Sequence, residues 1–219
     1  MRPGMRTIAI GDVHGCSLAL ETLIAAIRPQ PDDKLVFLGD YVDRGPDSRS
    51  VVEFLLTLAF RCQVIPLLGN HESMLLSGQE LGNPNPFWLQ CGGQETLTSY
   101  GGSLADIPDE HWDFFRSCRR YYETERHLFF HANYDPELAP DQQPELLLLW
   151  QHITTQVPGP HQSGKTVVVG HTPQRSGRIL DFGHLLCIDT ACFAGGWLSA
   201  IDLDSKKVWQ SNLMGDLRE

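Results

Sequence analysis

Polar residues with the chemistry of metal ligands follow short apolar runs at five places along the chain. Each run contains three to five apolar, often β-branched residues and ends in a turn that carries aspartate, asparagine or histidine. Two carboxylates, three imidazoles and one amide oxygen form a mixed N/O donor set without thiolates, which suits Mn²⁺, Fe or Zn²⁺. These residues are Asp12, His14, Asp40, Asn70, His131 and His171.

Six donors exceed what one open catalytic ion takes, but they are about right for two ions that share a bridging carboxylate. Two ions roughly 3.5–4 Å apart lower the pKa of a bridging water and stabilise both oxygens of an in-line phosphoryl displacement. The donor set therefore predicts a dinuclear hydrolytic site.

Buried strands must position these residues, because short apolar runs that end at a polar turn are typical of parallel sheets. Helical patterns over residues 17–27 and 48–60 separate the first three runs, which indicates βαβ units with parallel neighbours. Parallel strands end at one edge of a sheet, so the five turns should meet there. The expected strands are 7–10, 35–38, 64–68, 128–130 and 167–169.

The remaining segments predict loops, helices and further strands. Residues 78–102 are rich in glycine and proline, which favours loops with a short helix at 94–100. A longer helix is expected at 109–122. The alternating pattern of the C-terminal part predicts antiparallel strands of a second sheet at 184–189, 197–203 and 207–210. We therefore expect a layered α/β fold in which residues 1–219 form one domain.

Composition limits the partners that the protein can have. The 219 residues include 17 basic and 27 acidic residues, for a net charge of −10 and no basic block, which argues against nucleic-acid binding. No apolar run approaches the roughly 20 residues of a membrane span. The chain reaches Asp12 before a signal-peptide apolar region forms, so a cytoplasmic location is expected. The oligomeric state is left open.

The motifs GDVHG, GDYVDRG, GNHE and GHT, in this order and spacing, resemble the PPP family of metal-dependent Ser/Thr phosphoprotein phosphatases, above all its small bacterial and phage-type members. The resemblance covers residues from about 8 to 200. It implies the calcineurin-like metallophosphoesterase fold, a sandwich of two mixed β-sheets flanked by helices. By the family's pattern Asp12 and His14 hold one metal and Asp40 bridges both ions. The second metal is then held by Asn70, His131 and His171.

The resemblance also implies three catalytic roles. Arg44 would bind the phosphoryl oxygens, and His71, paired with Asp43, would be the general acid for the leaving oxygen. The chain departs from the family at two positions. Asn133 stands where glycine is usual, and His152 stands where a second phosphate-binding arginine normally follows a tryptophan, so His152 is a possible substrate-binding residue. Arg175 and Arg178 are alternative sources of that charge.

The function expected from these features is hydrolysis of phosphomonoesters, with phosphoserine and phosphothreonine in proteins or a small phosphoester as substrate and two Mn²⁺ ions as cofactor; Fe and Zn²⁺ are alternatives. A dinucleoside polyphosphate hydrolase of the Ap4A type is the second candidate, although those enzymes tend to depart from the motif at Asp43. A catalytically silent phosphoester-binding module is a third, but such copies usually lose metal ligands first, and all are present here.

Overall fold

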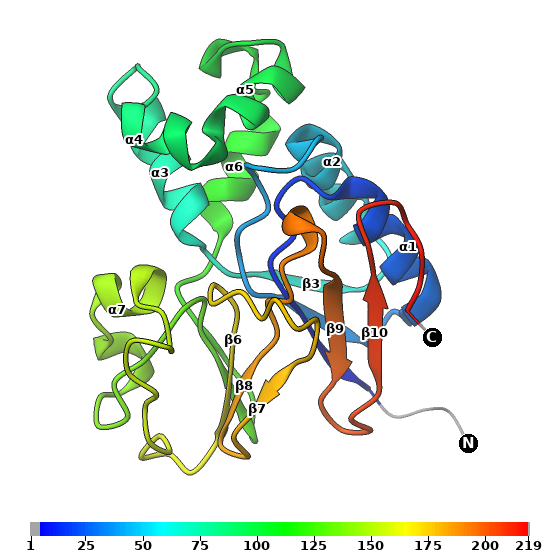
Figure 1. Ribbon diagram of the computed structural model, residues 1–219, viewed down its shortest axis with the longest axis vertical. Coiled ribbons are helices and arrows are strands. Elements are labelled where there is room, and N and C mark those ends of the chain that lie inside the picture. The colour runs from blue at the N-terminus through cyan, green and yellow to red at the C-terminus, as the bar shows by residue number, and fades with distance from the viewer. Residues whose placement is uncertain (1–4, 219) are drawn as a thin grey trace.

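The computed structural model describes residues 5–218 and contains two five-stranded β-sheets packed against each other (Figure 1). The first sheet has the strand order β10-β9-β1-β2-β3. The three N-terminal strands are parallel, whereas β9 and β10 run antiparallel to their neighbours. Its strands are β1 (Thr7–Ile10), β2 (Lys34–Phe37), β3 (Gln63–Pro66), β9 (Leu198–Asp202) and β10 (Val208–Ser211).

The second sheet has the order β4-β5-β6-β8-β7 and is also mixed. Its three central strands, β5, β6 and β8, are parallel, and the short outer strands pair antiparallel with them. These strands are β4 (Tyr122–Glu123), β5 (His127–Phe129), β6 (Thr166–Val169), β7 (Leu180–Asp181) and β8 (Leu185–Cys187).

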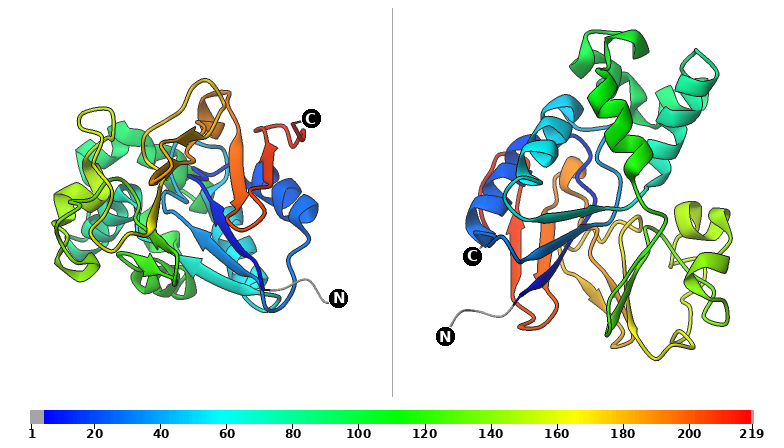
Figure 2. Two further views of the ribbon diagram at one scale, coloured as in Figure 1. Left: turned by 90° about the horizontal axis from the view of Figure 1, so that it is seen from below. Right: turned by 180° about the vertical axis from the view of Figure 1, so that it is seen from behind.

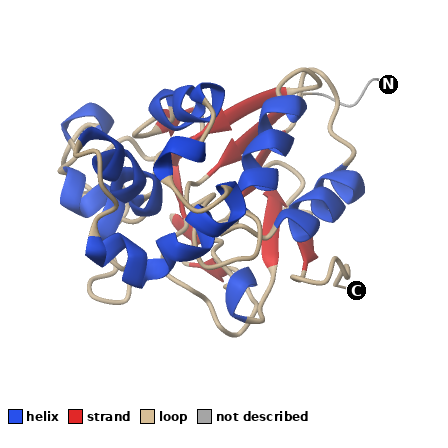
Figure 3. Ribbon diagram, turned by 90° about the horizontal axis from the view of Figure 1, so that it is seen from above, coloured by secondary structure: helices blue, strands red, loops and turns tan. Residues whose placement is uncertain are grey.

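Helices flank the sandwich on both sides, as the views in Figure 2 show. Helices α1 (Ser17–Ile27) and α2 (Ser48–Leu58) pack on the first sheet, and α7 (Glu145–Trp150) packs on the second. The segment between β3 and β4 forms a helical insertion beyond the ends of the strands (Figures 1 and 3). The insertion contains α3 (Asn70–Glu80), α4 (Pro86–Trp88), the π-helical turn η1 (Leu89–Gly93), α5 (Gln94–Tyr100), the 3-10 turn η2 (Leu104–Asp106) and α6 (Asp109–Ser117).

Alternating side chains of the strands build the hydrophobic cores on either side of each sheet. In β1, Ile8 and Ile10 belong to the core beneath α1 and α2, whereas Ala9 belongs to the core between the two sheets. Leu128 of β5 lies in a third core under α7, while Phe129 faces the first sheet. This period of two is what strands buried on both faces require.

Most of the elements predicted from the sequence are confirmed to within two residues. One exception concerns the strands near the C-terminus. Of the three strands predicted there, only β8 belongs to the second sheet, and it runs parallel to β6. The other two, β9 and β10, extend the first sheet. The prediction of three antiparallel strands in a second sheet was therefore wrong. The physical reason is the free edge of β1: its backbone groups are buried and need partners, and β9 supplies them through pairs such as Ala9–Ile201.

Two further expectations need correction. The helix predicted for 109–122 ends at Ser117, because Cys118 adopts an extended conformation and the chain then forms β4. The five polar turns do not all leave one sheet: three follow β1, β2 and β3, and two follow β5 and β6 of the other sheet. They still meet, because both sheets end at the same edge of the sandwich. Within residues 5–218 no helix is long and apolar enough to cross a bilayer.

The turn after β3 passes close to the turn after β2, and Gly69 makes this approach possible. A side-chain carbon at Gly69 would overlap the Asp40 carboxylate and backbone nitrogen. Gly78, within α3, is a matched control, because the nearest atom to a carbon added there is 3.4 Å away.

We expect Gly69→Ala to lower the free energy of unfolding by about 1–3 kcal/mol, the usual cost of forcing extra volume into a packed site. Gly78→Ala should be neutral or stabilise by up to about 1 kcal/mol through helix propensity. Urea denaturation of both variants measures the difference. Equal stabilities would show that the two turns can separate without cost.

Candidate active site

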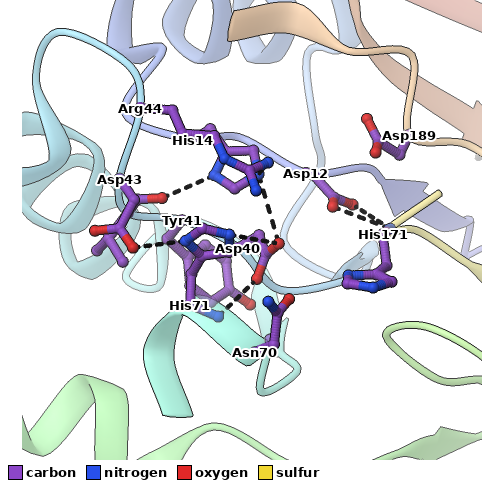
Figure 4. Close-up of polar contacts among 12 residues, drawn as sticks. Asp12, His14, Asp40, Tyr41, Asp43, Arg44, Asn70, His71, His171 and Asp189 are labelled. Carbon is purple, nitrogen blue, oxygen red and sulfur yellow. Dashed lines mark hydrogen bonds and ion pairs between the residues drawn. The ribbon is translucent and has the colours of Figure 1, made fainter. Parts of the chain in front are cut away.

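The carboxylate of Asp40 lies between two groups of imidazoles at the shared edge of the sheets (Figure 4). Its Oδ2 is 3.5 Å from His14 Nε2 and 4.0 Å from His71 Nε2. Its Oδ1 is 3.5 Å from His131 Nε2, and His171 completes this second group. Asp40 and the first three of these histidines are buried, and His171 is partly buried. The arrangement is the one that a carboxylate shared by two cations would need.

Backbone carbonyls fix which nitrogen of each imidazole faces the site. Nδ1 of His14 donates to the carbonyl of Val42 at 2.9 Å, and Nδ1 of His131 donates to that of Leu38 at 2.7 Å. Nε2 of His171 donates to the carbonyl of Trp150 at 3.2 Å. The remaining nitrogen of each ring therefore carries a lone pair and points inward. Such second hydrogen bonds are typical of histidines that ligate metals.

Unprotonated acceptors crowd together around His131. Its Nε2 is 3.2 Å from His171 Nδ1 and 3.0 Å from the side-chain oxygen of Asn70. Turning the amide would let it donate to both ring nitrogens and to the Asp40 carboxylate. With the amide oxygen facing the ring nitrogens, a cation would satisfy all of these acceptors. The residues present thus fit a divalent metal on this side of Asp40.

The pKa values of these side chains favour the protonation states that bind metal. Burial, followed by the neighbouring imidazole of His131, lowers the pKa of His171 to about 3. Burial likewise lowers the pKa values of His14 and His131. Burial opposes ionisation of Asp40, yet the surrounding imidazoles hold its pKa well below the usual range. Neutral imidazoles and a carboxylate are the forms that bind metal.

Asp12 lies near these donors but is turned toward the turn after β6 (Figure 4). Its two carboxylate oxygens accept the backbone N–H of His171 at 3.2 and 3.0 Å. It is not among the donors grouped around Asp40, so its role as a ligand of the first metal stays a prediction. Burial and the charge of Asp189 raise its pKa well above the usual range.

Asp189 is a buried carboxylate that the sequence analysis missed. It follows β8, it is 3% exposed, and it accepts the backbone N–H of Ala191 at 2.9 Å. Burial is the main cause that raises its pKa to about 6. The pattern that points to the candidate ligands was present here as well, because Leu185–Cys187 is an apolar run and Asp189 comes two residues after it.

Asp43 and His71 form a buried pair beside Asp40. His71 Nδ1 and Asp43 Oδ2 are 2.6 Å apart, and Asp43 is fully buried. Trp88 Nε1 donates to the same oxygen at 2.7 Å, and the Thr96 hydroxyl donates to Asp43 Oδ1 at 2.6 Å. Burial lowers the pKa of His71, but the carboxylates of Asp40 and Asp43 outweigh this effect and raise that pKa above its ordinary value.

Trp88 and Thr96 were not found from the sequence. Trp88 lies in α4, in a stretch that was expected to be loop, and Thr96 lies in the predicted helix at 94–100. No spacing rule connects them to Asp43, which is more than 40 residues away. Only the folded insertion brings them to it.

A family profile described as calcineurin-like phosphoesterase matches residues 5–199. The chain belongs to this family. Serine/threonine-protein phosphatase 1 of Salmonella typhimurium is 30% identical over 199 residues, which cover 87% of this chain and 88% of that protein. A symmetrical bis(5'-nucleosyl)-tetraphosphatase of Methylococcus capsulatus is 28% identical over 91% of this chain and 92% of its own. A crystal structure described as a putative diadenosine tetraphosphatase superposes with a TM-score of 0.69 at 24% identity, covering 95% and 94% of the two chains.

These comparisons confirm the resemblance to the PPP phosphatases and the sandwich of two mixed sheets flanked by helices. The phosphoesterase is a hydrolase of a family that uses two divalent metal ions, and the side chains around Asp40 are its candidate ligands.

Arg44 and His152, the predicted phosphate-binding residues, each lie next to a histidine of the site. Nη1 of Arg44 is 2.9 Å from His14 Nε2. The ring of His152 lies 4.6 Å from that of His171, centroid to centroid, so the residue in the place of the second arginine does reach the site. Its contact with substrate stays a prediction. Asn133 is turned away and donates to the carbonyl of Gln156 at 3.3 Å. Arg175 and Arg178 are exposed on the segment before β7.

Removing ligands should separate the two metal positions of the phosphoesterase. We expect Asp40→Asn to reduce binding at both positions, because its carboxylate faces both groups of donors. Asn70→Ala should weaken mainly the position next to His131, with a loss of affinity on the order of 10–100-fold. Elemental analysis after dialysis against limiting Mn²⁺ measures both. Retention of about two ions per chain by Asp40→Asn would rule out the bridging position.

Proposed function

We propose that the protein hydrolyses phosphomonoesters, with phosphoserine and phosphothreonine of proteins as substrates and Mn²⁺ as the metal. The observation that carries this proposal is the buried Asp43–His71 pair with a separation of 2.6 Å. A serine or threonine alkoxide is a poor leaving group and needs a proton as the P–O bond breaks. A polyphosphate leaving group is much less basic and departs without such help. The pair therefore favours a substrate whose leaving group is an alkoxide.

Each group of residues in the site would have its own role in the reaction. The donors around Asp40 other than His71 would hold the two ions, which would supply Lewis-acid stabilisation of the phosphoryl oxygens and activation of a water molecule. Arg44 would donate hydrogen bonds to the phosphoryl oxygens, as the planar guanidinium is suited to do. His71 would give the proton from Nε2 to the leaving oxygen. Asp43 would stabilise the imidazolium before the transfer, held in place by Trp88 and Thr96.

A second candidate, hydrolysis of dinucleoside polyphosphates, is supported by relatives of comparable similarity. The symmetrical bis(5'-nucleosyl)-tetraphosphatase of Methylococcus capsulatus aligns with 91% of this chain. With His152 in place of a second arginine, the predicted phosphate-binding residues are less basic than the phosphatase pattern implies. The two candidate functions therefore have to be separated by experiment.

A substrate panel tests the proposal directly. With Mn²⁺ added to metal-stripped protein, kcat/KM should be highest for phosphoserine and phosphothreonine peptides, by about tenfold or more over diadenosine tetraphosphate and an aryl diester. A phosphotyrosine peptide reports whether aromatic esters are accepted. A preference for the dinucleotide would establish the second candidate instead. Binding of metal without hydrolysis of any compound would identify a catalytically silent module.

The general-acid role of His71 predicts a dependence on the leaving group. His71→Asn should slow hydrolysis of a phosphoserine peptide by about 10²–10⁴-fold. An aryl phosphate with an acidic phenol should lose much less, because its phenolate leaves unprotonated. The fall in wild-type rate at high pH, where His71 gives up its proton, should disappear in the variant. Equal losses on both substrates, with the metal content unchanged, would remove His71 from this role.

A further inference from the structure

Phe193 contacts two residues of the site from the loop between β8 and β9. It lies in the 3-10 turn η4 (Cys192–Ala194) between β8 and β9. Its ring centroid is 4.7 Å from the guanidinium carbon of Arg44 and 4.9 Å from the ring centroid of His14. We propose that Phe193 is a positioning residue that holds Arg44 for phosphoryl binding. This inference rests on the proposed function, in which Arg44 binds the phosphoryl oxygens.

Arg44 needs such support, because its side chain is exposed and its polar contacts are few. Nη1 faces His14 Nε2, and Nε donates to the carbonyl of Cys91 over a long 3.4 Å. A single lone pair on His14 Nε2 cannot accept a hydrogen bond and bind a cation at once. The contact with His14 would therefore be lost once His14 binds a metal. The ring of Phe193 and the Cys91 carbonyl would then remain to orient the guanidinium.

The position of the guanidinium over the face of the Phe193 ring suits the task. An aromatic ring attracts a guanidinium through the face of the planar group. The N–H groups in the plane stay free to donate to phosphoryl oxygens. The backbone of Arg44 is fixed separately, since its N–H donates to the Gly92 carbonyl at 3.1 Å and a side chain at Gly92 would come within 2.7 Å of it. Phe193 thus orients the end of a side chain whose base is already rigid.

Phe193 itself is held firmly. Its ring packs against the core beneath α1 and α2. The turn that carries it is closed by backbone hydrogen bonds, from Ala194 N–H to the Ala191 carbonyl at 3.0 Å and from Gly195 N–H to the Cys192 carbonyl at 3.2 Å. A residue anchored in the core can restrict a mobile guanidinium, whereas an exposed aromatic could not.

The test is calorimetric titration of inorganic phosphate into the Mn²⁺-loaded protein. Phe193→Leu and Phe193→Met remove the ring, and both should weaken phosphate binding about two- to five-fold, as expected for an exposed cation–π contact. Phe193→Tyr keeps the ring and should bind like the wild type. Phe182→Leu, which removes a half-exposed ring on the turn between β7 and β8, is the matched control and should change nothing. Metal content and melting temperature are recorded for each variant.

A double variant identifies the partner through which Phe193 acts. Arg44→Ala should weaken phosphate binding more than the loss of the ring, and Phe193→Leu should cause no further loss in that background. The same two- to five-fold loss with and without Arg44, or unchanged binding by both ringless variants, would overturn the inference. If Arg44→Ala itself leaves phosphate binding unchanged, the role of Arg44 in the proposed function fails first. The two failures are therefore distinguishable.

Discussion

Asp40 lies in the turn after β2, the strand between β1 and β3, and it contacts the turns that follow both of those strands. Its carboxylate faces the imidazoles of both groups, while its backbone carbonyl accepts the N–H groups of Val13 and His14 at 3.0 and 2.8 Å. Its own N–H donates to the carboxylate of Glu72 at 2.8 Å. Displacement of this one residue would therefore move the first motif, the second motif and the start of α3 together.

Glu72 has a larger part in this arrangement than its position beside His71 suggests. The fully buried carboxylate accepts backbone N–H groups from both turns. Those of Asp40, Tyr41 and Val42 lie at 2.8, 2.7 and 3.2 Å, and that of Gly69 lies at 3.1 Å. These donors would otherwise be buried without partners, which is costly. One acidic side chain thus joins the turn after β2 to the turn after β3 and fixes the distance between Asp40 and Asn70.

The sequence allowed the strands, the first two helices and the donor residues to be predicted, because each depends on a local pattern. A run such as 7–10 reveals a buried strand by its composition, and the residue after it is placed by the strand's direction. Contacts made across the fold left no such pattern. Trp88 and Thr96 reach Asp43 only because the helical insertion folds over it, and β9 pairs with β1 from the far end of the chain. Phe193 was missed for the same reason.

Backbone conformation at the site has a consequence for how such a protein changes over time. Among the described residues, the non-glycine positions with positive φ include five of the predicted site residues, namely His14, Asp40, Asp43, Arg44 and His171. Left-handed backbone costs a non-glycine residue about 1–2 kcal/mol, so the site is assembled at the expense of stability. Selection for a stable fold alone would replace these residues, by glycine above all. In a lineage that no longer uses the site, substitutions should therefore accumulate first in the catalytic turns. The core strands should be the last part of the sequence to change.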